Sequence, residues 1–243
     1  MSTHVTYRLK DANGAVVDAW RRWFHPVFLG VLLAAMLVGF APSFYLRLLF
    51  TDRPLPGYLQ LHGVVLTSWF TLAFAQACLV AAKRVDRHRR LGWLAAANAV
   101  LVVPVSVFVA MRAIGRYEAA GVHPDESQFI VIGDLVSLAV FTALIGAALA
   151  MRRRPDWHRR LMAVACVIII GPAIGRLERL GVAVPVPVAL VGLLAAVIAH
   201  DVVTLRRVHR ATVWGTLLVV VALAGVLGVV GTPAGQALID ALR

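Results

Sequence analysis

Charged residues are scarce in this chain of 243 residues: Asp, Glu, Lys and Arg make up 15 % of it, whereas ordinary globular domains have about 25 %. Hydrophobic residues account for 60 %, and the mean hydropathy is +0.83. A soluble domain with so little charge could not cover its surface with polar groups. The composition therefore excludes a soluble globular protein and indicates a polytopic membrane protein.

Several familiar motifs are also missing. The sequence has no glycine-rich phosphate loop, no G-x-S-x-G elbow, no H-E-x-x-H zinc motif and no C-x-x-C motif. Its two cysteines, Cys78 and Cys166, lie in apolar segments, so no disulfide framework is indicated. The sequence thus names no catalytic residue and no dedicated set of metal ligands. Whether the protein is an enzyme stays open, and any chemistry would have to occur in a helix bundle or at its faces.

Long apolar runs are what the sequence does have. A run of about 20 residues suffices to cross a hydrocarbon core. Residues 25–243 are therefore predicted to form one all-α transmembrane domain, preceded by a tail (residues 1–24) with a short interfacial helix at Ala15–Phe24. The seven predicted spans are about Pro26–Leu46, Leu61–Ala82, Leu91–Met111, Phe129–Ala150, Leu161–Ile174, Val182–Ala199 and Thr212–Val230.

The net charge of +12 is distributed unevenly between the two sides of these spans. The amino-terminal segment and the second, fourth and sixth loops hold 17 cations and five acids, whereas the other side holds seven of each. By the positive-inside rule, the amino terminus is predicted in the cytoplasm and the carboxyl terminus outside, in a bacterial inner membrane. Topology and contact with anionic lipids explain the charge, so no nucleic acid is expected as a partner.

A repeat joins the second and fourth loops. Lys83–Leu91 returns 70 residues later as Arg153–Leu161, with the shared core Asp-x-His-Arg-Arg-Leu. We interpret residues of about 61–114 and 129–180 as two copies of a helical hairpin that form a pseudo-symmetric four-helix core.

One reading of the repeat is structural. Asp86 and Asp156 stand where an N-cap residue would accept hydrogen bonds from the first backbone N–H groups of the third and fifth spans. The arginines that follow would then anchor these helix ends among lipid headgroups.

The other reading is a ligand site. The repeat places His88 and His158 at one depth on equivalent helices, where they would face each other and bind a haem iron, a metal ion or an anionic headgroup. In the haem case, Arg89 and Arg159 are free to pair with the propionates.

Polar residues inside the predicted spans form a second candidate site. His62, Trp69 and Gln76 recur at seven-residue steps along one face of the second span, and Asp134 lies about one turn inside the fourth. The repeat gives His62 and Asp134 similar depths. They are interpreted either as interhelical contacts that hold the bundle together or as a polar path for protons or a ligand.

Several of these motifs occur together between about Pro42 and Arg179. They are Leu61-His62-Gly63, Trp69, Gln76, Asp86-x-His88-Arg89-Arg90-Leu91-Gly92-Trp93, Asp156-Trp157-His158-Arg159-Arg160-Leu161-Met162 and Gly171-Pro172-Ala173-Ile174-Gly175-Arg176-Leu177. In this combination the chain resembles an uncharacterised bacterial family of multipass membrane proteins with paired D-x-H-R-R-L loops. That resemblance implies membrane class and no particular activity.

A looser likeness is to haem b membrane cytochromes of the ferric-reductase and ascorbate-reducible kind. His88 and Gly92 match their H-x-x-x-G step, whereas Met162 stands in place of the glycine after His158. This likeness implies a b-type haem for membrane electron transfer. Two alternatives remain: a carrier of protons or small solutes that uses the polar path, and a scaffold or accessory subunit that binds anionic lipids. A homo-oligomer or a membrane-protein partner is compatible with each.

Overall fold

The chain folds into a bundle of long helices. The computed structural model describes the backbone of residues 2–243 and the side chains of residues 14–243. Short π-helical and 3-10 segments (η1–η3) interrupt the α-helices. In chain order the elements are α1 (Ser2–Phe40), η1 (Ala41–Tyr45), η2 (Arg47–Leu49), α2 (Gly57–Ala81), α3 (Val85–Ala119), α4 (Pro124–Ala150), α5 (Pro155–Ile168), α6 (Gly171–Arg176), η3 (Leu177–Leu180), α7 (Val186–Leu205), α8 (Arg210–Val229) and α9 (Pro233–Ala241).

Seven helical segments are long and apolar enough to cross a membrane, which confirms the predicted all-α polytopic bundle and its seven spans. The first, Gly14–Tyr45, contains Ala15–Phe24, so the predicted interfacial helix is continuous with the span as part of α1. The charged side chains of residues 1–13, which are predicted to lie in the cytoplasm, are outside the side chains that the structure describes. Large apolar side chains cover the outer surface, among them Val100 (71 % exposed) and Leu227 (64 % exposed), as expected where a bundle faces lipid.

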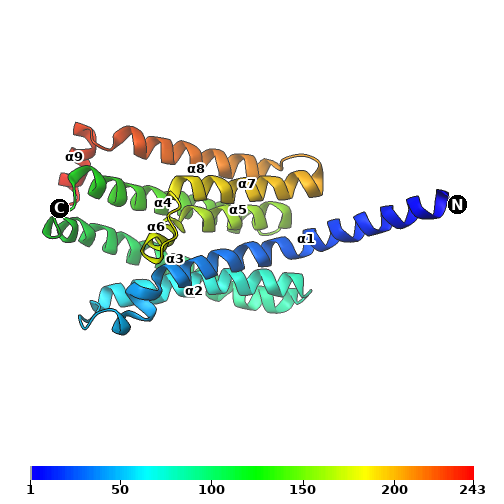
Figure 1. Cartoon of the computed structure of the whole chain (residues 1–243), viewed down its shortest axis with the longest axis horizontal. Helices are drawn as coiled ribbons and strands as arrows, with labels where there is room; N and C mark the ends of the chain where they lie inside the picture. Colours follow the sequence, from blue (N-terminus) through cyan, green and yellow to red (C-terminus); the bar gives the residue numbers. More distant parts are fainter. Residues whose placement is uncertain (1) are drawn as a thin grey trace.

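The helix ends sort into two groups. Figure 1 shows the α2–α3, α4–α5 and α7–α8 connections at one end of the molecule, with the amino-terminal part of α1 projecting beyond them, and the carboxyl terminus with α9 at the other end. The amino-terminal segment and the three connections that carry the excess of Lys and Arg therefore share one end, which we call the basic end.

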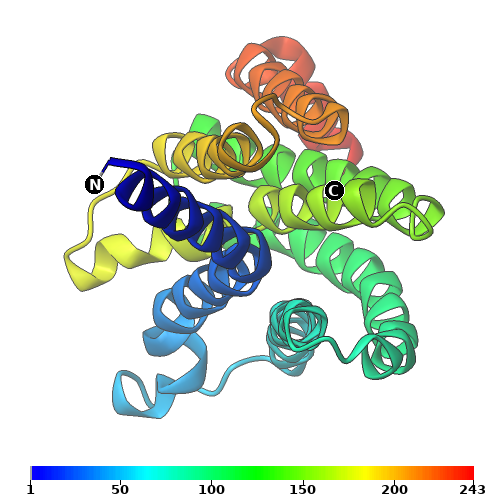
Figure 2. The same ribbon diagram turned by 90° about the vertical axis from the view of Figure 1, so that its right-hand side faces the viewer.

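Helix α5 lies at the centre of the bundle. It packs against α1, α4, α7 and α8, and Figure 2 shows these helices arranged around it. The side chains of Ala163–Val167 have no exposed surface. Other helices, and not lipid, therefore cover this part of α5 on every side.

Both predicted hairpins are present, α2 with α3 and α4 with α5. They differ near their prolines. Pro104 lies inside the uninterrupted helix α3, whereas the helix of the second hairpin ends at Ile168 and restarts as α6 with Pro172 in its first turn. Proline removes a backbone donor and crowds the preceding turn, and in the second hairpin the helix breaks there.

The prediction that Asp86 and Asp156 cap their helices is wrong. Helices α3 and α5 begin at the residue before each aspartate, so Arg84 and Arg154 occupy the N-cap positions. Neither arginine side chain caps its helix. In α5 the reason is Pro155, whose fixed φ angle favours the first helical position. Each aspartate lies in the first turn, where its charge favours the positive end of the helix dipole.

Two backbones come together at Gly39 of α1. A Cβ atom added to Gly39 would lie 2.3 Å from the carbonyl oxygen of Ala173 in α6. The absence of a side chain therefore sets how closely α1 approaches the second hairpin.

We expect Gly39→Ala to lower stability by about 1–3 kcal/mol, because the new methyl group must push two helix backbones apart. The measurement is the thermal unfolding midpoint in detergent. Gly192→Ala is the matched control, since a Cβ at Gly192 would meet no atom within 4 Å. Equal midpoints for the two variants would contradict the close approach.

Candidate functional site

The structure brings His88 and His158 together at the basic end. Their ring centroids lie 6.4 Å apart, and the ring planes are nearly perpendicular at 85°. His88 belongs to the first turn of α3 and His158 to the first turn of α5, and both side chains are half-buried. The two copies of the repeat thus present their imidazoles to each other.

A main-chain group of the preceding helix orients the His158 ring. Nδ1 of His158 donates to the carbonyl oxygen of Ala148 in α4, at 2.9 Å. The His88 ring contacts the backbone of Gln76 in α2, and its Nδ1 is buried with no hydrogen-bond partner in the described part of the chain. Ligating histidines are commonly held as His158 is, with one nitrogen on a carbonyl and the other free.

The two arginines predicted beside this pair have different surroundings. Arg89 is exposed at the rim of α3. Arg159 is half-buried, donates to Asp156 at 2.6 Å and is a charged neighbour of His25 and His200. Arg159 therefore stands between His158 and a second histidine cluster.

That second cluster is a pair that we did not predict. His25 of α1 and His200 of α7 have ring centroids 5.2 Å apart, and His200 stacks on Phe24 at 4.1 Å. Nε2 of His25 and Nδ1 of His200 are both buried and form no hydrogen bond with described residues. The two histidines belong to no repeat or shared motif, so only the packing of α1 against α7 shows that they meet.

Arg160, next to this cluster, forms a buried ion pair with Asp201 of α7. Neither side chain has any exposed surface, and Nε and Nη2 of Arg160 lie 2.7 and 2.6 Å from Oδ1 of Asp201. The other carboxylate oxygen accepts from the Thr212 hydroxyl at 2.5 Å and from the His209 backbone at 3.0 Å. One buried carboxylate thus joins α5, α7 and the start of α8.

The stripe on α2, which we define as His62, Trp69 and Gln76, faces the interior of the bundle. Trp69 is 1 % exposed, packs edge-on against Phe141 of α4 and has the Cys166 thiol among its neighbours. Each stripe residue has a buried polar atom that forms no hydrogen bond within the described chain: Nδ1 of His62, Nε1 of Trp69 and Oε1 of Gln76. Polar atoms without partners therefore recur through the depth of the bundle.

Asp134, which is predicted to lie at the depth of His62, is half-buried in α4. Among the described residues no hydrogen bond joins it to His62. Arg176 of α6 is instead a charged neighbour of both. The structure thus groups His62, Asp134 and Arg176 at the end opposite the histidine pairs.

Comparison with known proteins found no match: no protein-family model, no curated protein and no solved structure is similar to the chain.

The site must therefore be interpreted from its chemistry. Neutral imidazoles can ligate a metal or pass protons, and a carboxylate inside a membrane protein can carry a proton. Among the described residues, no three or more His, Cys, Asp or Glu side chains are grouped so that they could hold a metal ion. The histidine pair at His88 and His158 suits a group that brings most of its own ligands.

We expect Arg160→Met to destabilise the protein by about 3–5 kcal/mol, because it leaves the buried carboxylate of Asp201 without a counter-charge. The measurement is the unfolding midpoint in detergent. Arg90→Met is the matched control, since Arg90 holds the same position in the first copy of the repeat and is exposed.

The double variant Arg160→Met with Asp201→Asn should recover most of that loss, since it removes both charges and keeps an acceptor for Thr212. A double variant less stable than Arg160→Met alone would contradict the assignment.

Proposed function

We propose that this integral membrane protein transfers electrons and binds a b-type haem between His88 and His158. The observation that carries the proposal is the pair of neighbouring imidazoles, whose ring centroids lie 6.4 Å apart, with the His158 ring held by the Ala148 carbonyl of the preceding helix. Metal–imidazole bonds of about 2 Å on opposite sides of one ion place two ring centroids about 6 Å apart. The spacing therefore suits an iron held by both rings.

The number of ligands also favours haem over a bare metal ion. A protein-bound zinc ion takes about four ligands, and only two imidazoles meet here. A porphyrin supplies the equatorial nitrogens itself, so that two histidines complete the coordination of its iron. When bound, such a group would supply one-electron exchange.

The residues around the pair have definable roles in this proposal. The Ala148 carbonyl fixes the proton of His158 on Nδ1 and leaves Nε2 free to ligate. Gly92, one turn after His88, keeps space open beside α2, since a Cβ there would lie 3.4 Å from Nε2 of Gln76. Arg89 and Arg159 offer guanidinium groups to the propionates. The proposal agrees with the likeness to haem b ferric-reductase-like cytochromes.

We also assign the basic end to the cytoplasmic side of a bacterial inner membrane, with the amino terminus inside. The support is the excess of 12 positive charges on that side. The arginines of these loops would lie among anionic headgroups.

The unpartnered polar atoms of the α2 stripe favour a second function, which is proton transfer. They connect the region of Asp134 and His62 with that of Gln76 and His88. Chains of carboxyl and imidazole groups within a bundle are typical of proton pathways. In this function, water would fill the gaps between the stripe residues.

We expect the purified protein to show a Soret band that shifts, and an α-band that appears, on reduction with dithionite. His88→Ala and His158→Ala should each lower the haem content at least tenfold, because one axial ligand is lost. The measurements are absorbance spectra and a pyridine haemochrome assay.

His123→Ala is the control for this series, since His123 lies exposed in the α3–α4 connection. A featureless visible spectrum from folded protein produced with sufficient haem would refute haem binding. Equal haem content in the His123, His88 and His158 variants would refute the ligand assignment.

For the second function, Asp134→Asn should reduce proton uptake into proteoliposomes at least tenfold, because an amide cannot carry the proton. Uptake is followed with an enclosed pH-sensitive dye. Asp125→Asn changes an exposed carboxylate at the same end and should leave uptake unchanged. Undiminished uptake in Asp134→Asn would remove Asp134 from the path.

A further inference from the structure

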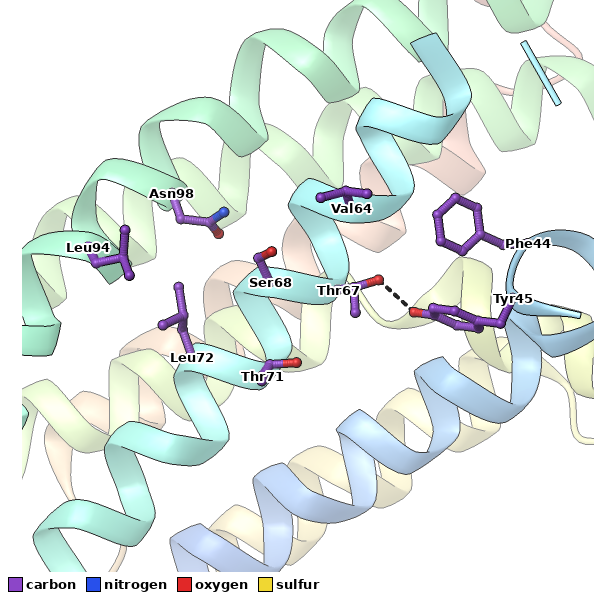
Figure 3. A pocket seen from close by; sticks show the side chains of 9 residues that line it. All are labelled: Phe44, Tyr45, Val64, Thr67, Ser68, Thr71, Leu72, Leu94 and Asn98. Atoms are coloured by element: carbon purple, nitrogen blue, oxygen red, sulfur yellow. Dashed lines mark hydrogen bonds between the residues drawn. The ribbon is translucent and has the colours of Figure 1, made fainter. Parts of the chain in front are cut away.

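A groove of about 460 Å³ lies on the outer surface of the bundle between η1, α2 and α3 (Figure 3). Its apolar walls come from Phe44, Val64, Leu72 and Leu94. Its other lining residues all carry hydroxyl or amide groups: Tyr45, Thr67, Ser68, Thr71 and Asn98. None of the lining residues is charged.

Asn98 is a lining residue whose hydrogen bonds are not all formed within the described chain. Its side chain is 9 % exposed and reaches from α3 toward α2, as Figure 3 shows. Its Nδ2 donates to the Val65 carbonyl at 3.4 Å, whereas Oδ1 is buried and forms no hydrogen bond with any described residue. A buried acceptor without a partner is costly, and a ligand hydroxyl could satisfy it.

The Tyr45 and Thr67 hydroxyls, in contrast, have partners. They hydrogen-bond each other at 2.5 Å, and Thr67 donates to the Gly63 carbonyl at 2.6 Å. Gly63 also lets the Phe44 ring lie directly on α2, since a Cβ at this position would come within 2.3 Å of that ring. The hydroxyl groups at this end of the groove are therefore already hydrogen-bonded. Oδ1 of Asn98, in contrast, still lacks a donor.

The groove opens toward lipid. It lies in the middle part of α2 and in the spanning part of α3, and its wall residues Val64 and Leu94 are 56 % and 57 % exposed. A ligand would enter from the bilayer, so it must be neutral and mostly apolar and must carry a hydroxyl donor. Pockets for small molecules have volumes of about 300–1,000 Å³, which includes this one.

We propose that the groove binds the head of a lipid-soluble quinol, whose hydroxyl donates to Oδ1 of Asn98. The choice of a quinol among hydroxylated lipids rests on the proposed electron transfer, which requires a redox partner that can diffuse in the bilayer. Leu94 follows His88 by six residues on α3, a rise of about 9 Å along the helix. The quinol head would therefore lie within a few helical turns of the histidine pair.

The test measures saturable binding of decylubiquinol to the protein in nanodiscs, by co-sedimentation under anaerobic conditions. Asn98→Leu should weaken binding roughly tenfold, since it removes the acceptor and nearly keeps the volume. Leu94→Trp should abolish binding because the indole fills the groove. Val100→Trp is the matched control: it adds the same side chain to an exposed position of α3 outside the groove and should bind normally.

Absorbance spectra of the same samples separate this proposal from haem binding. Saturable binding that is weakened in Asn98→Leu and lost in Leu94→Trp supports the groove, whether or not the protein holds haem. Unchanged affinity in Leu94→Trp refutes the site even where haem is present, and so does the absence of saturable binding. Dioleoylglycerol that displaces the quinol with equal affinity would overturn the choice of quinol.

Discussion

The ion pair between Arg160 and Asp201 is the interaction on which the basic end of the bundle depends. Both side chains are fully buried, and the carboxylate also binds Thr212 and the backbone of His209. Removing the Arg160 charge would leave the Asp201 carboxylate buried without compensation, so the pair favours one arrangement of α5, α7 and the start of α8. That arrangement determines where the neighbouring residues on α5 point, His158 and Arg159 among them.

The ion pair also explains how the two copies of one motif differ. Arg160 occupies the position that Arg90 holds in the first copy, yet Arg90 is exposed and Arg160 has no exposed surface. The second copy lies at the centre of the bundle, where other helices surround it, and the first copy lies at its edge. The histidines nevertheless keep equivalent positions, because each lies in the first turn of the second helix of its own hairpin.

The features that concern function gather around α2, α3 and α5. The imidazole pair lies at the basic end, the stripe of unpartnered polar atoms follows the inner face of α2, and the groove with Asn98 lies between the outer faces of α2 and α3. Helices α7 and α8 take part mainly through the buried carboxylate network, which supports α5. The two hairpins therefore hold most of these features, and α7 and α8 form a supporting frame beside them.

The number of spans, their shared basic end and the equivalent depths of His88 and His158 follow from sequence, because apolar length, loop charge and a repeated motif can be read from the chain alone. The stripe could be predicted to face inward, since no lipid-facing helix tolerates His62 and Gln76 comfortably. The partner of Asp201, the meeting of His25 with His200 and the placement of Arg176 beside Asp134 could not be predicted. These depend on which helices pack together and how each rotates about its axis, and in spans rich in Ala, Val and Leu that choice is made by the close packing of the whole bundle.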